Sequence, residues 1–297
     1  MYLTGFADEA AVGIDGQIEA TKELGWSNIE SRNIDGTNIH DLSDEKFEEV
    51  AAKLDAADVH VNCFGSAISN WGKHVTDETD ASLDELDRAI PRMQRLGTKL
   101  IRVMSYAVLP DRDPDDQMEE ERFKRVREVV ARLTDAGITP VHENCMNYGG
   151  MGWPYTLKLL ENVPGLKLVF DTGNPVFTDD RCKPKPYPKQ SAWEFYEHVK
   201  EHIAYLHVKD CVWKPEADKK EVFTFPGEGD GDVERIVKDL LDNGYDGGIS
   251  IEPHMALVFH DEDEDPSKKA DFMRENYIEY GRRMMDLIRK VGHGDKL

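Results

Sequence analysis

Residues 80–105 read DASLDELDRAIPRMQRLGTKLIRVMS, and this stretch contains the unit from which the chain is built. Apolar residues recur every three or four positions over 80–96, with Asp and Arg between them, which predicts an amphipathic helix. These apolar residues are Leu83, Leu86, Ile90, Met93 and Leu96. Gly97 follows the helix, as glycine often does at helix ends. The apolar run at 99–105 then predicts a strand.

The same succession of a short Val- and Ile-rich run, a polar loop and an amphipathic stretch recurs eight times. We expect strands at 3–8, 27–32, 58–64, 99–105, 139–144, 166–171, 203–209 and 248–253. We expect helices at 14–24, 43–56, 80–96, 117–136, 154–162, 191–202, 231–243 and 268–290. Eight alternations favour a closed (β/α)8 TIM barrel, α/β in class and forming a single domain over 1–297. An open doubly wound sheet is the alternative, but no GxGxxG follows the first strand.

The amino-acid composition and net charge of the chain indicate which classes of binding partner to exclude. The chain has 297 residues, 39% of them hydrophobic, which is enough to build a core. Asp and Glu number 59 against 37 Lys and Arg, a formal net charge of −22. A surface this acidic repels phosphate backbones and anionic membranes, so we expect neither nucleic acid nor a membrane as partner. There is no signal-peptide pattern at MYLTGFADEA and no long apolar stretch, so the expected location is cytoplasmic.

Polar residues end four consecutive predicted strands. Glu143 ends the fifth, Asp171 the sixth, His207 lies at the end of the seventh and Glu252 ends the eighth. In a barrel these strand ends meet at one face, where active sites lie. Three carboxylates held close together need a cation to neutralise them. An oxygen-rich set with one imidazole suits Mn²⁺, Mg²⁺ or Co²⁺ better than a thiolate zinc site, with Zn²⁺ left open and Mn²⁺ expected first.

Short motifs along the chain resemble a known family. They are GFADEA at 5–10, FDTGN at 170–174, HVKD at 207–210, PGEGDG at 226–231 and IEPH at 251–254. The chain resembles, over nearly its whole length, the xylose-isomerase-like TIM-barrel superfamily, the sugar phosphate isomerase/epimerase family. The resemblance implies a metal held by Glu143, Asp171, His207 and Glu252. It also implies that the two glutamates double as an acid–base pair.

This chemistry predicts a divalent-metal-dependent isomerase or epimerase of a small ketose-type sugar. The reaction is proton abstraction next to a carbonyl through a metal-stabilised enediolate, with Glu143 and Glu252 on opposite faces of the substrate. The alternative is a lyase or dehydratase that adds β-elimination to the same enolisation, acting on an inosose or a 3-oxo-glycoside, C-glycosides included. An apurinic endonuclease is a remote alternative because Asn174 stands where many members have a metal-binding or substrate-binding His. A non-catalytic subunit is the other remote alternative.

Further residues near the strand ends are candidates for the same site. His142 is a candidate third acid–base group, although strict strand alternation points it away from Glu143. Six residues are candidate substrate contacts, each with an ordinary structural role as the alternative. They are Asn174, Lys209, His254, Glu30, Arg32 and Trp71. The resemblance also implies a homodimer or homotetramer acting on a small-molecule sugar, with an accessory subunit conceivable under the lyase alternative.

Overall fold

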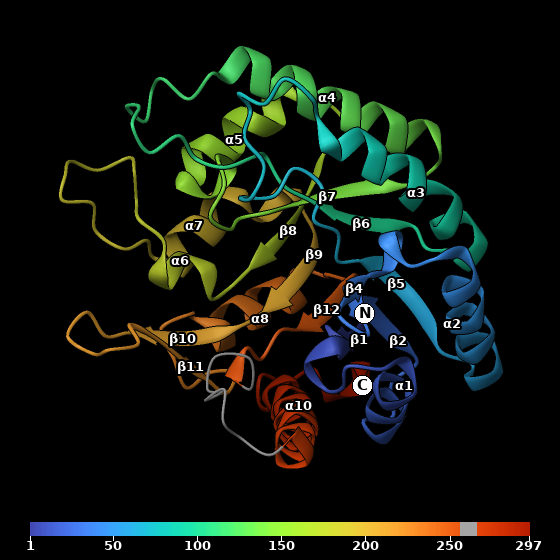
Figure 1. The fold of residues 1–297 in the computed structure, drawn as a ribbon. Helices are drawn as coiled ribbons and strands as arrows, with labels where there is room; N and C mark the ends of the chain where they lie inside the picture. The colour runs from blue at the N-terminus through green and yellow to red at the C-terminus, as the bar shows by residue number, and fades with distance from the viewer. Residues whose placement is uncertain (256–265) are drawn as a thin grey trace.

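A computed structural model describes residues 1–255 and 266–297, and its eight parallel strands curve into a barrel surrounded by helices (Figure 1). The strands are β1 (Tyr2–Gly5), β2 (Asn28–Ser31), β5 (His60–Phe64), β6 (Leu100–Val103), β7 (Thr139–Glu143), β8 (Lys167–Asp171), β9 (Ile203–Val208) and β12 (Gly248–Ile251). They pair in the order β1-β12-β9-β8-β7-β6-β5-β2. A parallel bridge between Phe6 and Glu30 joins the two ends of this sheet. The predicted single-domain TIM barrel is confirmed.

Helices follow the strands around the outside of the barrel (Figure 1). They are α1 (Ile14–Glu23), α2 (Asp44–Ala57), α3 (Ala81–Leu96), α4 (Glu119–Asp135), α5 (Trp153–Asn162), α6 (Asn174–Phe177), α7 (Ala192–Val199), α8 (Val233–Asp242) and α10 (Pro266–Lys290). The short helix α6 was not predicted, and the other eight helices agree with the predicted ranges within three residues at each end. No helix in the described part of the chain is long and apolar enough to cross a membrane.

Helix α3 shows why the repeating unit folds as it does. The Asp80 side chain accepts a hydrogen bond from the backbone N–H of Ser82 and caps the first turn. Leu86 and Met93 are fully buried on the face that the spacing indicated. Gly97 ends the helix with φ of 71°, a left-handed conformation that glycine adopts without strain. The chain then turns directly into β6.

One strand boundary and one helix boundary show how local structure shifts an element from its predicted range. After β1 the chain leaves the sheet into a 3-10 turn at Ala7–Glu9, three residues before the predicted strand end. Helix α4 begins at Glu119 rather than at 117 because Met118 has a left-handed backbone, with φ of 54°. The side chain of Gln117 contacts the preceding loop. Its Oε1 accepts the backbone N–H of Leu109 at 2.8 Å, which holds the preceding loop in place.

Two hairpins were not predicted. One pairs β3 (Asn33–Ile34) with β4 (Thr37–Asn38) after β2. The other pairs β10 (Asp210–Trp213) with β11 (Glu221–Thr224) and projects from the barrel at the left of Figure 1. The carboxylate of Asp210 accepts backbone N–H groups from Gly227, Gly229 and Gly231, at 2.8 to 3.0 Å. It thereby organises the glycine-rich loop that leads into α8.

The interior of the barrel places its side chains in layers. Val141, Val169 and Tyr205 belong to a small buried cluster inside the strands. Side chains two residues further along a strand point to the same side of the sheet. The next inward positions are therefore Glu143, Asp171 and His207, and Glu252 follows Ser250 in the same way on the neighbouring strand. Along these strands the inward-facing side chains thus change from an apolar layer to a layer of three carboxylates and one imidazole.

A buried histidine makes the stability of the fold depend on pH. His40 is fully buried beside α3, and burial lowers the pKa of its imidazole to about 4, more than neighbouring Asp41 raises it. The unfolded chain binds a proton at about pH 6.5. Stability from neutral His40 is therefore present above pH 6.5 and lost as the pH falls toward 4.

We expect the free energy of unfolding of His40→Gln to depend less on pH between pH 7 and pH 5 than that of the parent. Protonation of His40 in the unfolded chain should lower the free energy of unfolding of the parent by about 2 kcal/mol between pH 7 and pH 5. The variant should lack this decrease. Urea denaturation at several pH values measures it, with His60→Gln, at an exposed histidine, as control. An unchanged slope in His40→Gln would contradict the assignment.

Candidate metal centre

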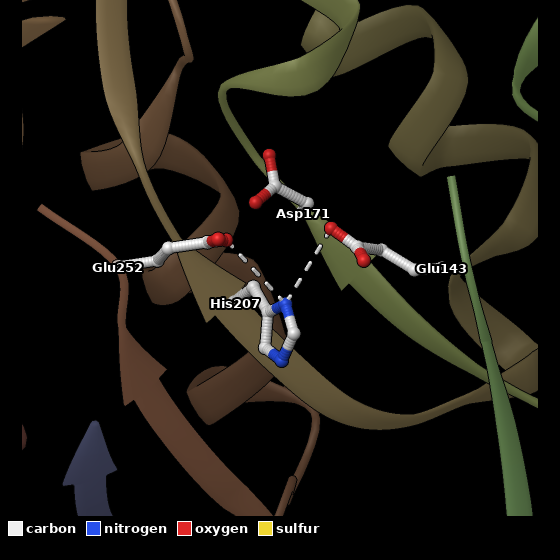
Figure 2. A group of neighbouring side chains, drawn as sticks. All are labelled: Glu143, Asp171, His207 and Glu252. Atoms are coloured by element: carbon white, nitrogen blue, oxygen red, sulfur yellow. Dashed lines mark ion pairs between the residues drawn. The ribbon is translucent and has the colours of Figure 1, made fainter. Parts of the chain in front are cut away.

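Four acidic or imidazole side chains meet at the carboxyl ends of adjacent strands. Glu143 ends β7, Asp171 ends β8, His207 lies in β9 and Glu252 follows β12. One candidate ligand atom from each lies within 4.8 Å of the others, and all four side chains are buried. Figure 2 shows the carboxylates of Glu143 and Glu252 approaching the His207 ring from opposite sides. The structure brings the four predicted ligands together.

One ring nitrogen of His207 has a hydrogen-bonding partner, and the other has none among the described residues. Nε2 lies 3.0 and 3.1 Å from the two carboxylate oxygens of Glu30. Nδ1 faces the cluster, 3.8 Å from Glu143 Oε1 and 3.8 Å from Glu252 Oε2, and makes no hydrogen bond. A buried nitrogen without a hydrogen bond is costly. A cation between this nitrogen and the carboxylates would satisfy it, while Glu30 orients the ring from behind.

The electrostatics of the cluster also favour a cation. Burial, with Glu252 and Glu143 adding to it, raises the pKa of Asp171 to about 7 despite the ammonium of Lys209. Burial also acts to raise the pKa of Glu143, but the guanidinium of Arg102 more than offsets this and holds the pKa at about 2. For Glu252, burial is outweighed by Lys209 and His254, so its pKa lies well below the usual range. Burial acts to lower the pKa of the His207 imidazole, but Glu30, followed by Glu143, raises it to about 10. The cluster therefore draws positive charge to itself, while the ionised form of Asp171 stays disfavoured.

Permanent cations neutralise only part of this charge. Lys209 Nζ lies 3.1 Å from Asp171 Oδ2 and 3.2 Å from Glu252 Oε2. Arg102 Nη1 lies 3.1 Å from Glu143 Oε2. In the connected ion-pair network, three such cations face six carboxylates. The cations are Lys209, Arg32 and Arg102, and the carboxylates are Asp8, Glu9, Glu30, Glu143, Asp171 and Glu252. Three oxygen ligands and one imidazole with this excess of charge fit a divalent cation of the oxygen-preferring class.

Asn174 donates hydrogen bonds to two residues of the cluster, Glu143 and Asp171. Its side-chain amide donates a hydrogen bond to Glu143 Oε1 at 3.0 Å. Its backbone N–H and that of Gly173 donate to Asp171 Oδ1, at 2.6 and 2.9 Å. One oxygen of Asp171 is thus occupied by the start of α6, which leaves the other oxygen for Lys209 or a cation.

A cavity of about 600 Å³ is lined by two of the four residues, Glu143 and Glu252. Five of the six predicted substrate contacts line it, namely Asn174, Lys209, His254, Arg32 and Trp71. Glu30 does not line it, because this fully buried carboxylate is turned to His207, Tyr205 and Ser250. The structure therefore places Glu30 behind His207 and outside the lining of the cavity.

His142 also lies away from the cavity. It is fully buried on the opposite side of β7 from Glu143, as the alternation of the strand dictates. Its Nε2 lies 3.0 Å from both Ser105 Oγ and Asn147 Oδ1. Burial lowers the pKa of its imidazole to about 4. The structure therefore does not bring His142, the predicted third acid–base group, to the cavity.

His254 adopts a left-handed backbone conformation, with φ of 56°, at the rim of the cavity. Glu9 holds it there, because Oε2 accepts the backbone N–H of His254 at 2.6 Å and Oε1 lies 2.9 Å from its Nδ1. The other ring nitrogen, Nε2, lies 3.6 Å from Glu252 Oε1. Sequence reasoning did not find Glu9, since it follows the first strand without any spacing that links it to residue 254.

Arg102 was missed too, although a signal for it exists. It is an arginine in the middle of the apolar run of β6, a position where a buried charge needs a partner. The structure supplies Glu143 as that partner.

Comparisons with known proteins agree with this fold. The family model described as "Xylose isomerase-like TIM barrel" matches residues 18–276. No curated protein matches the chain.

Several solved structures match over nearly their whole length. A 3-keto-D-glucoside 4-epimerase from E. coli is 17% identical with a TM-score of 0.62, and the match covers 95% of this chain and 99% of that one. A probable 3-DHS dehydratase from Bacillus anthracis is 15% identical with a TM-score of 0.66, covering 93% and 97%. A xylose isomerase-like TIM barrel protein from Mycobacterium smegmatis, in complex with magnesium, is 16% identical with a TM-score of 0.63, covering 95% and 96%. At these identities the likeness shows the fold alone.

We expect Glu30→Gln to weaken metal binding by about 10- to 100-fold, because the carboxylate that orients the His207 ring is lost. Calorimetric titration of the metal-free protein with Mn²⁺ measures the affinity, and the melting temperature checks the fold. Glu161→Gln, at an exposed position on α5, is the matched control and should bind Mn²⁺ like the parent. Parent-like affinity in Glu30→Gln would show that Nδ1 of His207 is not a ligand.

Proposed function

This chain belongs to the xylose isomerase-like TIM barrel family, and we propose that it is a divalent-metal-dependent isomerase or epimerase of a keto sugar. One observation carries the proposal. Glu143 and Glu252 lie on opposite sides of His207 at the floor of the cavity, each with a carboxylate oxygen 3.8 Å from Nδ1 (Figure 2). Two carboxylates that face each other across a substrate site are what proton transfer on two faces of a carbon requires.

Each glutamate would accept the proton through its carboxylate form, which its charged neighbours favour. Their pKa values lie below the usual range because Arg102 and Lys209, respectively, outweigh the effect of burial. One carboxylate removes the proton next to the carbonyl, and the electron pair of the C–H bond moves into an enediolate. A proton then returns to the same carbon from the opposite face, which is epimerisation. Alternatively it goes to the neighbouring carbon while the hydroxyl proton of the first carbon moves to the former carbonyl oxygen, which is isomerisation.

The remaining charged residues hold this arrangement. A divalent cation bound by the four ligands, Mn²⁺ in our proposal, supplies Lewis-acid stabilisation of charge developing beside the carbonyl. Lys209 places its ammonium between Asp171 and Glu252, close to where that charge develops. Arg102 and Asn174 hold the two oxygens of Glu143, which fixes the direction from which this base approaches.

A lyase is the second candidate, and the position of His254 favours it. Glu9 fixes the Nδ1 side of the ring, and Nε2 is left at the rim of the cavity beside Glu252. After a carboxylate has taken the proton next to the carbonyl, the electron pair can expel an oxygen one carbon further along. His254 is placed to protonate that departing oxygen.

We expect deuterium to enter a keto sugar next to its carbonyl when the Mg²⁺-loaded protein is incubated in D₂O with a panel of ketoses, inososes and 3-oxo-glycosides. Glu143→Gln and Glu252→Gln should each slow this exchange by about 10²- to 10⁴-fold, since each removes an acid–base group. NMR follows the exchange, and the product distinguishes isomerisation from loss of a leaving group.

Metal content is measured in parallel, because both residues are also proposed ligands. Glu19→Gln, on the exposed face of α1, is the control for removing a carboxylate. Full exchange in either metal-loaded glutamine variant would overturn the assigned roles.

A further inference from the structure

A second cavity of about 390 Å³ adjoins the one above the metal centre. Three residues line both cavities, namely Trp71, Met146 and Phe177. They come from three different segments, since Trp71 follows β5, Met146 follows β7 and Phe177 ends α6. The first cavity alone is within the range of about 300–1,000 Å³ that takes a drug-sized ligand. The binding space therefore extends beyond what a free monosaccharide fills.

The passage between the cavities is apolar and exposed. Trp71 is 46% exposed and Met146 is 54% exposed, and they are two of only five large hydrophobic side chains exposed in the described part of the chain. Val108, Pro110 and Met151 extend the apolar lining into the second cavity. Indole and phenyl rings beside a methionine sulfur favour a flat aromatic group over a hydrated sugar.

A cation lies in the second cavity without an acidic partner. The Arg181 guanidinium lies over the Tyr187 ring at 5.4 Å, and no carboxylate within residues 1–255 and 266–297 pairs with it. This occurs in a chain with 59 acidic residues against 37 basic ones. The other lysine or arginine of this cavity, Lys189, is paired with Asp179 at 2.7 Å. Arg181 is therefore the charge available to an anionic group on a ligand.

We propose that the substrate is a keto sugar that carries an aromatic substituent with an acidic edge. The sugar lies above the metal centre, the ring passes between Trp71 and Met146, and the acidic edge faces Arg181. This inference rests on the proposed function for the sugar half, whereas the second cavity is an observation independent of it.

Three 3-oxo-β-glucosides test the proposal by calorimetric titration of the Mg²⁺-loaded full chain. Their substituents are methyl, phenyl and 4-carboxyphenyl. The phenyl compound should bind about tenfold more tightly than the methyl compound, and the 4-carboxyphenyl compound more tightly again.

Two variants act only on the second cavity. Val108→Trp fills it and should bring the phenyl-to-methyl affinity ratio close to one. Arg181→Gln should remove only the advantage of the carboxyl group, and it serves independently if the larger side chain disturbs the loop. Phe272→Ala is the matched control, because Phe272 is 42% exposed on α10 and lines neither cavity.

The possible results separate this proposal from the proposed function. Equal affinity for the methyl and phenyl compounds, or ratios that neither variant changes, would overturn the aromatic subsite. Deuterium exchange is followed on the same samples. Exchange without an affinity ratio contradicts only the subsite, and a ratio without exchange contradicts only the proposed reaction.

Discussion

Three carboxylates and one imidazole lie inside the mouth of the barrel, with one candidate ligand atom from each within 4.8 Å of the others. The rest of the site depends on how the repulsion among these carboxylates is relieved. Like charges this close and this buried are unfavourable unless positive charge lies among them. Lys209, Arg102 and Arg32 provide some of it, yet Asp171 still has a pKa raised to about 7. A divalent cation would supply the remainder. The unpaired Nδ1 of His207, aimed at the same point, gives that cation its nitrogen ligand.

The barrel makes this concentration of charge feasible. Four neighbouring parallel strands, β7, β8, β9 and β12, end at the same face, and their inward alternation turns an apolar layer into a layer of ligands. A second set of side chains then fixes each ligand from outside. Glu30 holds His207, Asn174 holds Glu143, and the start of α6 holds Asp171. Three of the four residues are therefore positioned by the strands, and Glu252 directly follows one.

Much of this was predictable because it depends on local patterns. Hydrophobic periodicity located the eight barrel strands and the eight outer helices, and polar residues at strand ends located the four residues of the cluster. Partners that meet only through the closed barrel were beyond such reasoning. Glu9 meets His254 across 245 positions of sequence, and Glu30 meets His207 across 177. The parity of β7 did indicate that His142 points outward, and the structure follows that parity. The β10–β11 hairpin was not predicted, because residues 214–220 join its strands in place of a two-residue turn with a recognisable sequence.

The central claim is that this cluster binds a divalent metal through three carboxylates and one imidazole. Pulsed electron paramagnetic resonance of the Mn²⁺-loaded protein tests it most directly, because the method detects nitrogen nuclei bound to the ion. We predict a coupling from one histidine nitrogen in the parent protein and its loss in His207→Gln at matched Mn²⁺ occupancy. A spectrum without nitrogen coupling, or a coupling that persists in His207→Gln, would contradict the account.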